Sequence, residues 1–245
     1  MAINYAPEKL RPSEADEVEY PASDGEPMAE TGFHVTLIAF VLSMLRAFFR
    51  QQADVYVGSN MFVYYEEGNN NRKFAPDVFV TFGVPGFERR SWFMWKEGKG
   101  PDVIFEFTSK GTQEEDQFTK KGLYEWLGVK EYFLFDPLDE YLKPRLQGFR
   151  LVGGVYQPIS AVNGQLQSEL LGLTLGAEGN MLTLGNTKTG ERLLPPPELL
   201  DAYRTESTAR RVAEARVAEE STARRAAEAE VERLRAELEK LRGKQ

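Results

Sequence analysis

The stretch PDVIFEFTS, residues 101–109, carries a glutamate, Glu106, in the middle of an apolar run. Four apolar residues surround it: Val103, Ile104, Phe105 and Phe107. Continuous runs of this kind are typical of strands buried on both faces of an α/β sheet. An ionised carboxylate in such a strand loses hydration worth several kcal/mol, roughly, unless a metal or another cation compensates its charge. The stretch therefore predicts a buried strand with a cation beside Glu106.

The composition of the 245-residue chain allows one large domain, or one domain with an appendage. Hydrophobic residues make up 42%, which is enough to build a core. The chain has no cysteine, which excludes disulfides, thiolate metal sites and cysteine nucleophiles. Its single histidine, His34, argues against a histidine-rich metal site or a Ser-His-Asp triad, and is expected to be an ordinary helix residue.

Neither a secretion signal nor a membrane span is expected. The N-terminus lacks a basic region followed by an apolar core. The longest apolar stretch, residues 35–49, is interrupted by polar residues and is too short to cross a bilayer. The sequence therefore predicts a soluble cytoplasmic protein without a membrane partner.

The formal net charge of -8 is unevenly distributed along the chain. Residues 1–30 hold eight acidic and two basic residues, and they are rich in Pro, Glu and Ser. This composition predicts an acidic N-terminal arm over residues 1–29. From Leu199 onward acids and bases nearly cancel, so the middle of the chain is only mildly acidic. The net charge therefore does not exclude nucleic-acid binding.

Residues 30–195 combine helix and strand signals, which predicts one α/β domain. Apolar residues at helical spacing predict a first helix from Glu30 onward. The further elements expected are strands at 54–60, 61–67, 76–82, 101–109 and 129–137, a loop at 83–100 and a helix at 112–127. Repeated glycine turns between residues 141 and 194 predict short antiparallel strands and hairpins. The prolines at 195–197 mark a linker.

The tail repeats itself with a period of two heptads, STARRVAEARVAEE (207–220) and STARRAAEAEVERL (221–234). Its last part has apolar residues at steps of four and three: Ala227, Val231, Leu234, Leu238 and Leu241. This spacing predicts a coiled coil in a C-terminal helix over residues 199–243, which would join copies of the chain into a homo-oligomer. Charged residues occupy the same positions upstream. The alternative is therefore a single solvated helix stabilised by charge pairs.

Two carboxylates lie in strand contexts that a plain core would not favour, Asp77 in APDVFV and Glu106 in VIFEFT. If the strands pair, both side chains can converge on a hard divalent cation such as Mg²⁺ or Mn²⁺, which prefers oxygen ligands. In the next helix Asp116, Lys120 and Tyr124 are spaced four apart, on roughly one face. Two carboxylates and a lysine around a metal suit phosphodiester hydrolysis, with Lys120 as charge stabiliser or water activator.

Structural roles compete with these assignments. Asp77 follows Pro76 and could cap a strand end. Lys120 could be an exposed helix residue bridged to Asp116, and Tyr124 could pack beside the site or orient it. Lys121 points about 100° away from Lys120 by helix geometry. Which of the two lysines enters the site stays open.

The loop at 83–100 interleaves basic and aromatic side chains. Arg89, Arg90 and Lys96 are candidates for nucleic-acid contacts, because such mixtures suit phosphate binding and base stacking. The aromatic residues would equally fold the loop over the core. The sequence favours neither interpretation.

Several segments together resemble the bacterial Uma-two family of the PD-(D/E)XK, or restriction-endonuclease-like, superfamily. They are APDV (75–78), PDVIFEFTS (101–109), Asp116-x-x-x-Lys120-x-x-x-Tyr124, GVKEYFLFDP (128–137), LGL (171–173) and TGERLL (189–194). The likeness extends over residues 18–195, with the motifs in the family's order. It implies a mixed sheet flanked by helices, a metal site at Asp77 and Glu106, DNA as substrate, and a bacterial origin.

The last superfamily motif usually reads Glu, any residue, Lys, but its third position here is Thr108. The resemblance suggests that the lysine role has moved to Lys120, and that Glu30 of the first helix assists the metal. The leading hypothesis is a metal-dependent endonuclease that cuts DNA and assembles through its C-terminal helix. The rival is a nuclease-fold protein without catalysis, acting as a partner-binding or assembly module through its coiled coil.

Overall fold

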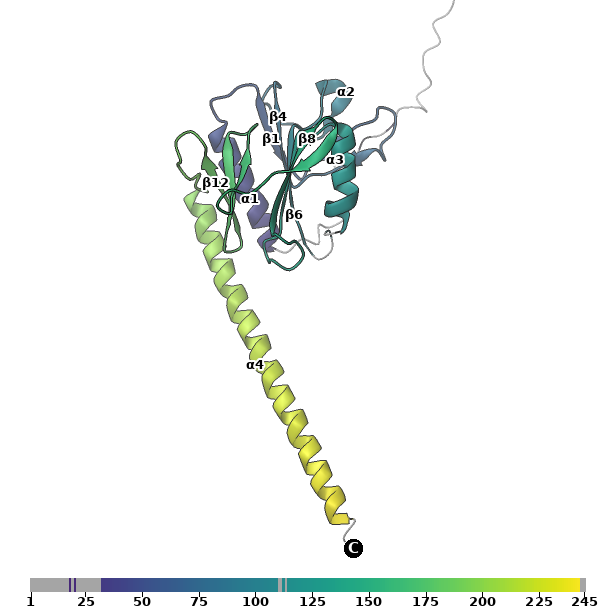
Figure 1. Cartoon of the computed structure of the whole chain (residues 1–245), viewed down its shortest axis with the longest axis vertical. Helices are drawn as coiled ribbons and strands as arrows, with labels where there is room; N and C mark the ends of the chain where they lie inside the picture. The colour runs from purple at the N-terminus through teal and green to yellow at the C-terminus, as the bar shows by residue number, and fades with distance from the viewer. Residues whose placement is uncertain (1–17, 19, 21–31, 110–111, 113, 243–245) are drawn as a thin grey trace, which may run out of the picture.

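A computed structural model describes residues 32–109 and 114–242, together with Val18, Tyr20 and Thr112. The predicted acidic arm, residues 1–29, lies outside the described residues apart from Val18 and Tyr20. The same holds for Glu30, the residue expected to assist the metal. The described chain forms a mixed α/β body from which one long helix projects (Figure 1).

The body is built on a mixed sheet, as the family resemblance implies, and this sheet has six strands. Its strands in spatial order are β1 (Val55–Ser59), β4 (Val78–Phe82), β6 (Val103–Phe107), β7 (Glu131–Phe135), β8 (Leu146–Val152) and β9 (Val155–Pro158). Strands β6 and β7 run parallel, and every other neighbouring pair is antiparallel. Val78 pairs with Phe105, so Asp77, just before β4, lies level with Glu106 on β6.

Side chains alternate along the strands, and this alternation divides the core into two layers. Helix α1 (Gly32–Phe48) covers one face of the sheet and packs on Val103, Phe105 and Phe107 of β6. A three-stranded antiparallel sheet contributes to the same layer. Its strands are β10 (Leu166–Ser168), β11 (Leu173–Glu178) and β12 (Met181–Asn186).

The opposite face is covered by the segment that follows β6. This segment begins as a π-helical stretch, η1 (Glu115–Lys120), and continues as α3 (Lys121–Leu127), which ends at Gly128 in the left-handed conformation. A small sheet joins the same layer; its strands are β2 (Val63–Tyr64), β3 (Lys73–Phe74) and β5 (Trp92–Phe93). Figure 1 shows α1 and α3 on opposite sides of the central strands.

Two predicted elements differ from the structure. The strand expected at 61–67 is reduced to the two residues of β2. The loop expected at 83–100 contains β5 and a short helix, α2 (Met94–Glu97), because Trp92 is drawn fully into the core. Aromatic side chains thus fold this segment onto the body, which is one of the two interpretations of its sequence.

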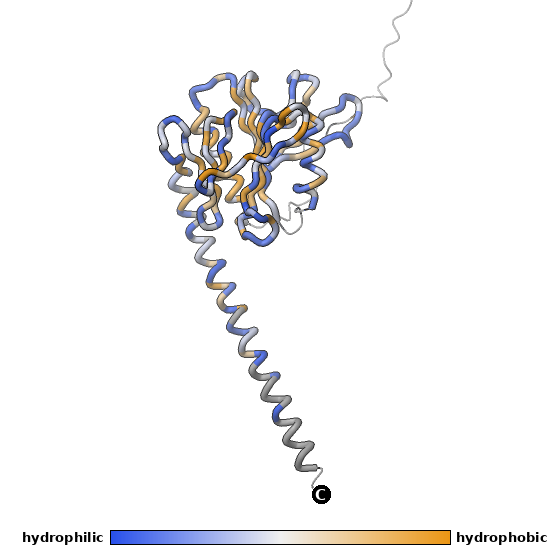
Figure 2. The backbone as a smooth tube through the Cα atoms, in the orientation of Figure 1, coloured by the Kyte–Doolittle hydropathy of each residue, from blue (hydrophilic) through white to orange (hydrophobic). Residues whose placement is uncertain are grey.

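Helix α4 (Pro197–Arg242) is continuous over 46 residues. Pro197 begins it, a position where the missing N–H costs nothing. Only its first turns run beside α1, where the Arg210 guanidinium lies 5.9 Å from the Phe33 ring centroid. The coloured portion of the projecting helix is mainly hydrophilic (Figure 2). No helix in the described part of the chain is long and apolar enough to cross a membrane.

Candidate active site

Glu106 points to the α3 side of the sheet. Because side chains alternate along β6, Phe105 and Phe107 face α1, whereas Ile104 and Glu106 face the opposite layer. The Glu106 side chain is 1% exposed, so water does not solvate its charge. The sequence thus placed this carboxylate correctly inside the fold, and the structure shows what lies against it.

Both carboxylate oxygens of Glu106 meet donors from the η1–α3 segment. Lys120 Nζ lies 3.0 Å from Oε2, and Tyr124 Oη donates to Oε1 over 2.6 Å. Charge-assisted hydrogen bonds of this kind are about twice as strong as neutral ones. Lys120 is therefore one cation that answers the buried charge of Glu106.

Asp116 completes the cluster from the first turn of the same segment. Its Oδ1 lies 2.9 Å from Lys120 Nζ, so one ammonium is shared between two buried carboxylates. The backbone oxygen of Asp116 accepts a 2.9 Å hydrogen bond from Tyr132 Oη of β7. This bond ties the π-helical stretch to the sheet. Stretches of π-helix are rare and often occur at functional sites.

Asp77 is held against the end of β6 by the backbone. Its Oδ2 accepts a 2.7 Å hydrogen bond from the Phe107 N–H, and His34 Nε2 of α1 lies 3.4 Å from the same oxygen. The side chain is 12% exposed. Asp77 therefore does more than cap a strand, because it joins β4, β6 and α1 at the level of Glu106.

The cluster holds more negative than positive charge. Glu106 and Asp116 share the ammonium of Lys120, and a third buried carboxylate, Asp77, lies level with Glu106 on the neighbouring strand without contacting that ammonium. Burial raises the pKa of Glu106 well above its usual range, and repulsion by Asp77 and Asp116 adds to the shift against the opposing effect of Lys120. Burial also raises the pKa of Asp116.

The same excess of negative charge shifts the pKa values of Lys120 and Tyr124. Burial opposes the charged form of Lys120, but Glu106 and Asp116 outweigh it and raise the pKa of the ammonium. Burial, followed by the Glu106 charge, raises the pKa of Tyr124 well above its usual range. Lys120 is thus kept protonated and Tyr124 is kept as a hydrogen-bond donor.

The donor set suits a hard divalent cation. No three His, Asp or Glu side chains form a ligand cluster within the part of the chain that the structure describes. Mg²⁺ does not need one, since it is commonly bound by one or two carboxylates and keeps several waters. The uncompensated charge and the oxygen donors of Asp77 and Glu106 fit such an ion, which would offset the repulsion in the cluster.

Lys121 takes a different direction from its neighbour. Its Nζ lies 3.7 Å from the centroid of the Phe149 ring, a cation–π contact on β8. Lys120 alone of the two lysines contacts Glu106. The contribution of His34 is the feature that the sequence did not predict, because its nearness to Asp77 depends on packing between α1 and β4.

The three basic residues proposed to contact nucleic acid divide into two kinds. Arg89 is 4% exposed, forms a bidentate pair with Glu97 over 2.7 and 2.9 Å, and donates to the carbonyls of Pro85 and Phe87. Its role as a DNA contact does not fit this environment, because its donors already hold the loop together. Arg90 and Lys96 are exposed, and their contact with nucleic acid stays a prediction.

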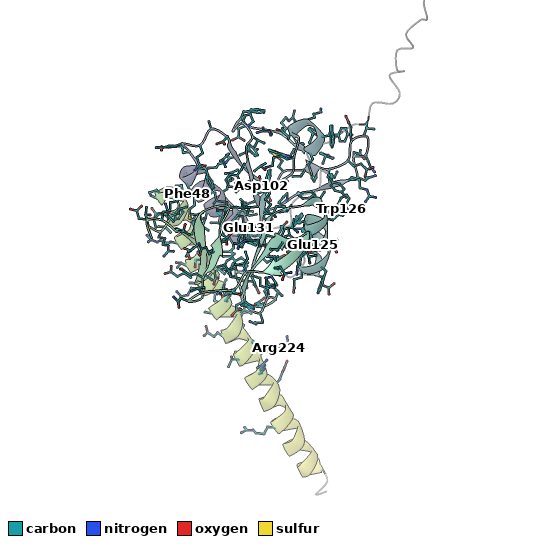
Figure 3. All side chains as sticks on the ribbon, turned by 45° about the horizontal axis from the view of Figure 1, so that its top comes forward. Phe48, Asp102, Glu125, Trp126, Glu131 and Arg224 are labelled. Carbon is teal, nitrogen blue, oxygen red and sulfur yellow. The ribbon has the colours of Figure 1, made fainter. Side chains whose placement is uncertain are left out.

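Two of the buried carboxylates outside the candidate site, Asp102 and Glu131, are labelled in Figure 3. Asp102, at the start of β6, contacts Lys99 Nζ and Lys130 Nζ at 2.6 and 3.0 Å. Glu131 of β7 pairs with Arg150 at 3.0 Å and also accepts a hydrogen bond from Ser168. Each acid has its own cation, unlike the crowded carboxylates around Lys120.

The fold and the cluster are those of a mixed α/β protein with a buried carboxylate–lysine centre. A family model, described as "Uma2: Putative restriction endonuclease", matches residues 7–184, and the chain belongs to this family. Membership confirms the resemblance seen in the motifs.

The comparisons with curated proteins and with solved structures add little to the family assignment. No curated protein matches the chain. Among solved structures, one described as "a putative nuclease belonging to DUF820" from Anabaena variabilis is similar at 12% identity. That match covers 58% of this chain and 75% of the other, with a TM-score of 0.43.

Proposed function

We propose that this protein is a Mg²⁺- or Mn²⁺-dependent endonuclease that hydrolyses phosphodiester bonds in DNA. One observation carries the proposal: the buried carboxylates of Glu106 and Asp116 share one largely buried ammonium, while a third carboxylate, Asp77, lies at the same level of the sheet. A plain core has no use for this surplus of buried charge. Membership in a family described as restriction endonucleases supports the same conclusion.

Asp77 and Glu106 would hold the metal, and each residue around them has a role that follows from its contacts. The bound metal would lower the pKa of a water and offset phosphate charge. Lys120, which stays protonated, stabilises the negative charge that develops on the phosphate and is less suited to accept a proton. Tyr124 orients Glu106 through its 2.6 Å hydrogen bond.

Hydrolysis forms one bond to phosphorus and breaks another. The oxygen of a water bonds to phosphorus, one P–O ester bond breaks, and the leaving oxygen takes up a proton. The water loses a proton in the same process. Burial raises the pKa of Asp116 and so makes this carboxyl a better proton acceptor than an exposed aspartate.

A second candidate function is an assembly module without catalysis, in which α4 is the working part. Its supporting observation is that α4 leaves the body and exposes apolar side chains, among them Val212 and Val217 at 50% and 66%. Val217 falls on the upstream continuation of the heptad seam, whereas Val212 does not, and exposed apolar residues on such a seam favour pairing with a second helix. We propose homo-oligomerisation through α4 under either function. Sedimentation of the full chain against a Leu234→Ser, Leu238→Ser variant tests it, and equal masses for both would contradict it.

The decisive experiment is nicking of supercoiled plasmid with Mg²⁺ or Mn²⁺. We compare wild type with Glu106→Gln and Lys120→Ala, and use Lys121→Ala as the matched control, because it removes a neighbouring lysine that does not contact Glu106. Wild type and the control should nick the plasmid, whereas the other two should lose activity. Nicking that survives Glu106→Gln would point to a contaminant.

Thermal unfolding gives a readout that is independent of cleavage. Mn²⁺ should raise the Tm of wild type, since a ligand that binds only the folded state stabilises it. The rise should be lost in Glu106→Gln. If folded wild type is stabilised by Mn²⁺ but does not nick the plasmid, the metal site is supported and the nuclease function is contradicted. The assembly function would then be the better explanation.

A further inference from the structure

Thr108 lies directly beyond β6 and beside the candidate site. Its backbone N–H donates to the Phe135 carbonyl over 2.8 Å, which keeps the chain extended past the last strand residue. The alternation that turns Phe107 towards α1 turns Thr108 to the other side of the sheet, the side of Glu106. Thr108 is 1% exposed.

The hydroxyl of Thr108 has no hydrogen-bond partner among the described residues of the protein. A buried polar group without a partner is costly, and most buried side-chain polar atoms are hydrogen-bonded to protein or to ordered water. Valine has nearly the same shape and would fill this position without that cost. The threonine hydroxyl therefore calls for a partner of another kind.

The spacing along the strand suits one water molecule. Residues two apart on a strand are separated by about 6.6 Å. Two hydrogen bonds of about 2.8 Å that meet at a water near the tetrahedral angle span about 4.5 Å, so the bridge requires the two side chains to lean towards each other. Such a bridge would connect the hydroxyl of Thr108 to the carboxylate of Glu106.

The neighbouring groups can bind this water. A carboxylate offers about four acceptor positions, and the contacts of Glu106 with Tyr124 and Lys120 use two of them. An ammonium has three N–H donors, and Lys120 directs two of them at Glu106 and Asp116. The hydroxyl, the carboxylate and the ammonium together provide the two to four partners that buried waters usually have.

We propose that Thr108 Oγ1 binds a buried water that is shared with Glu106 and Lys120, and positions it in the candidate site. The binding of the water rests on the unpartnered hydroxyl together with the neighbouring carboxylate and ammonium, and not on the proposed function. Its role as the water that attacks phosphorus rests on the proposed nuclease function. Thr108 is then a positioning residue, which acts through the water and not on the substrate.

The first test is a high-resolution crystal structure of the full chain and of Thr108→Val. The proposal expects an ordered water within hydrogen-bond distance of both Thr108 Oγ1 and the Glu106 carboxylate, and its loss in the valine variant. A hydroxyl that donates to a protein carbonyl, with no water beside it, would overturn the proposal. This arm is decided whether or not the protein cuts DNA.

The second test is steady-state cleavage by Thr108→Val and Thr108→Ser. The valine variant should lose about tenfold in kcat, the worth of roughly one hydrogen bond, with KM unchanged, and the serine variant should regain most of it. Thr81→Val is the matched control, since Thr81 in β4 is also fully buried with an unpartnered hydroxyl but lies four residues along the strand from Asp77. Equal kcat in Thr108→Val and wild type would refute the positioning role, and an inactive wild type would refute only the nuclease function.

Discussion

The two ends of β6 carry two buried acids in opposite electrostatic surroundings. Asp102, before the first strand residue, accepts hydrogen bonds from Lys99 and from the Phe82 N–H and also pairs with Lys130. Burial opposes its ionisation, but these contacts outweigh burial and lower its pKa. Glu106, near the other end, shares its one ammonium with Asp116, and burial raises its pKa.

Asp102 in its ionised form stabilises the fold, whereas Glu106 in its ionised form destabilises it. Asp102 connects the start of β6 to two neighbouring segments, and Lys99 and Lys130 compensate its charge. Glu106 keeps a surplus of charge inside the body, which costs free energy unless a further cation or a proton arrives. Such uncompensated clusters mark functional sites, because catalysis needs charge that is not already neutralised.

The largest difference should be seen in cleavage. Glu106→Gln keeps the shape and one acceptor but removes the charge, so cleavage should fall by about 10³-fold or more, as when a main electrostatic element is lost. Its free energy of unfolding near pH 7 should stay equal to wild type or rise, since a group with a raised pKa is not stabilised as an anion. Plasmid nicking and urea unfolding measure the two quantities. A variant that loses stability together with activity would make Glu106 a structural acid.

Asp102→Asn should give the opposite pair of results. It leaves Lys99 and Lys130 without their anion, and because both lysines are partly exposed we expect a loss of about 2 kcal/mol in unfolding free energy, less than for a fully buried pair. Cleavage per folded molecule should not change. Urea unfolding followed by fluorescence, and nicking normalised to the folded fraction, check the prediction. Cleavage that drops in the fully folded variant would extend the site to the start of β6.

Tyr124→Phe should have an intermediate effect. It removes the hydroxyl that donates to Glu106 over 2.6 Å while the buried ring keeps its packing against Phe74 and Tyr132. Loss of one charge-assisted hydrogen bond predicts about a tenfold fall in kcat. Tyr132→Phe, which removes the hydroxyl bonded to the Asp116 backbone oxygen, is the control. An equal fall in both would mean that the effect comes from the helix position and not from Glu106.

The sequence predicted the strand, the two acids and the helix lysine because local patterns carry this information. An apolar run fixes β6, and the spacing of Asp116, Lys120 and Tyr124 fixes which side chains lie near one another on the following segment. The choice between Lys120 and Lys121 needed the structure. It depends on a π-helical stretch, which has no recognised pattern in sequence.

The surroundings of Arg89 and His34 depend on how the chain folds and could not be read from the sequence. Arg89 lies in a mixture of basic and aromatic residues that suits DNA, yet Glu97 and two carbonyls take its donors once the segment folds back on Trp92. His34 meets Asp77 only because α1 crosses the end of β4. The partners of Arg89 lie within eight residues of it but surround it only once the segment folds, whereas His34 and Asp77 are far apart in the chain.

The pH dependence of stability gives the finest test of the contrast between the two acids. Glu106 has a raised pKa in the folded state, so its contribution is fully present below the unfolded value of about 4.5 and is lost as pH rises through the folded pKa. Asp102 has a lowered pKa, so its contribution is present above about 3.8 and is lost as pH falls through the folded pKa. Glu106→Gln should therefore flatten the alkaline side of the stability curve, and Asp102→Asn the acidic side. Urea unfolding from pH 3 to pH 8 measures both sides, and Asp116 adds to the alkaline slope in either variant because its pKa is also raised. If Glu106→Gln leaves the alkaline slope of the unfolding free energy unchanged, that slope comes from Asp116. The uncompensated charge would then lie on the η1–α3 segment and not on β6.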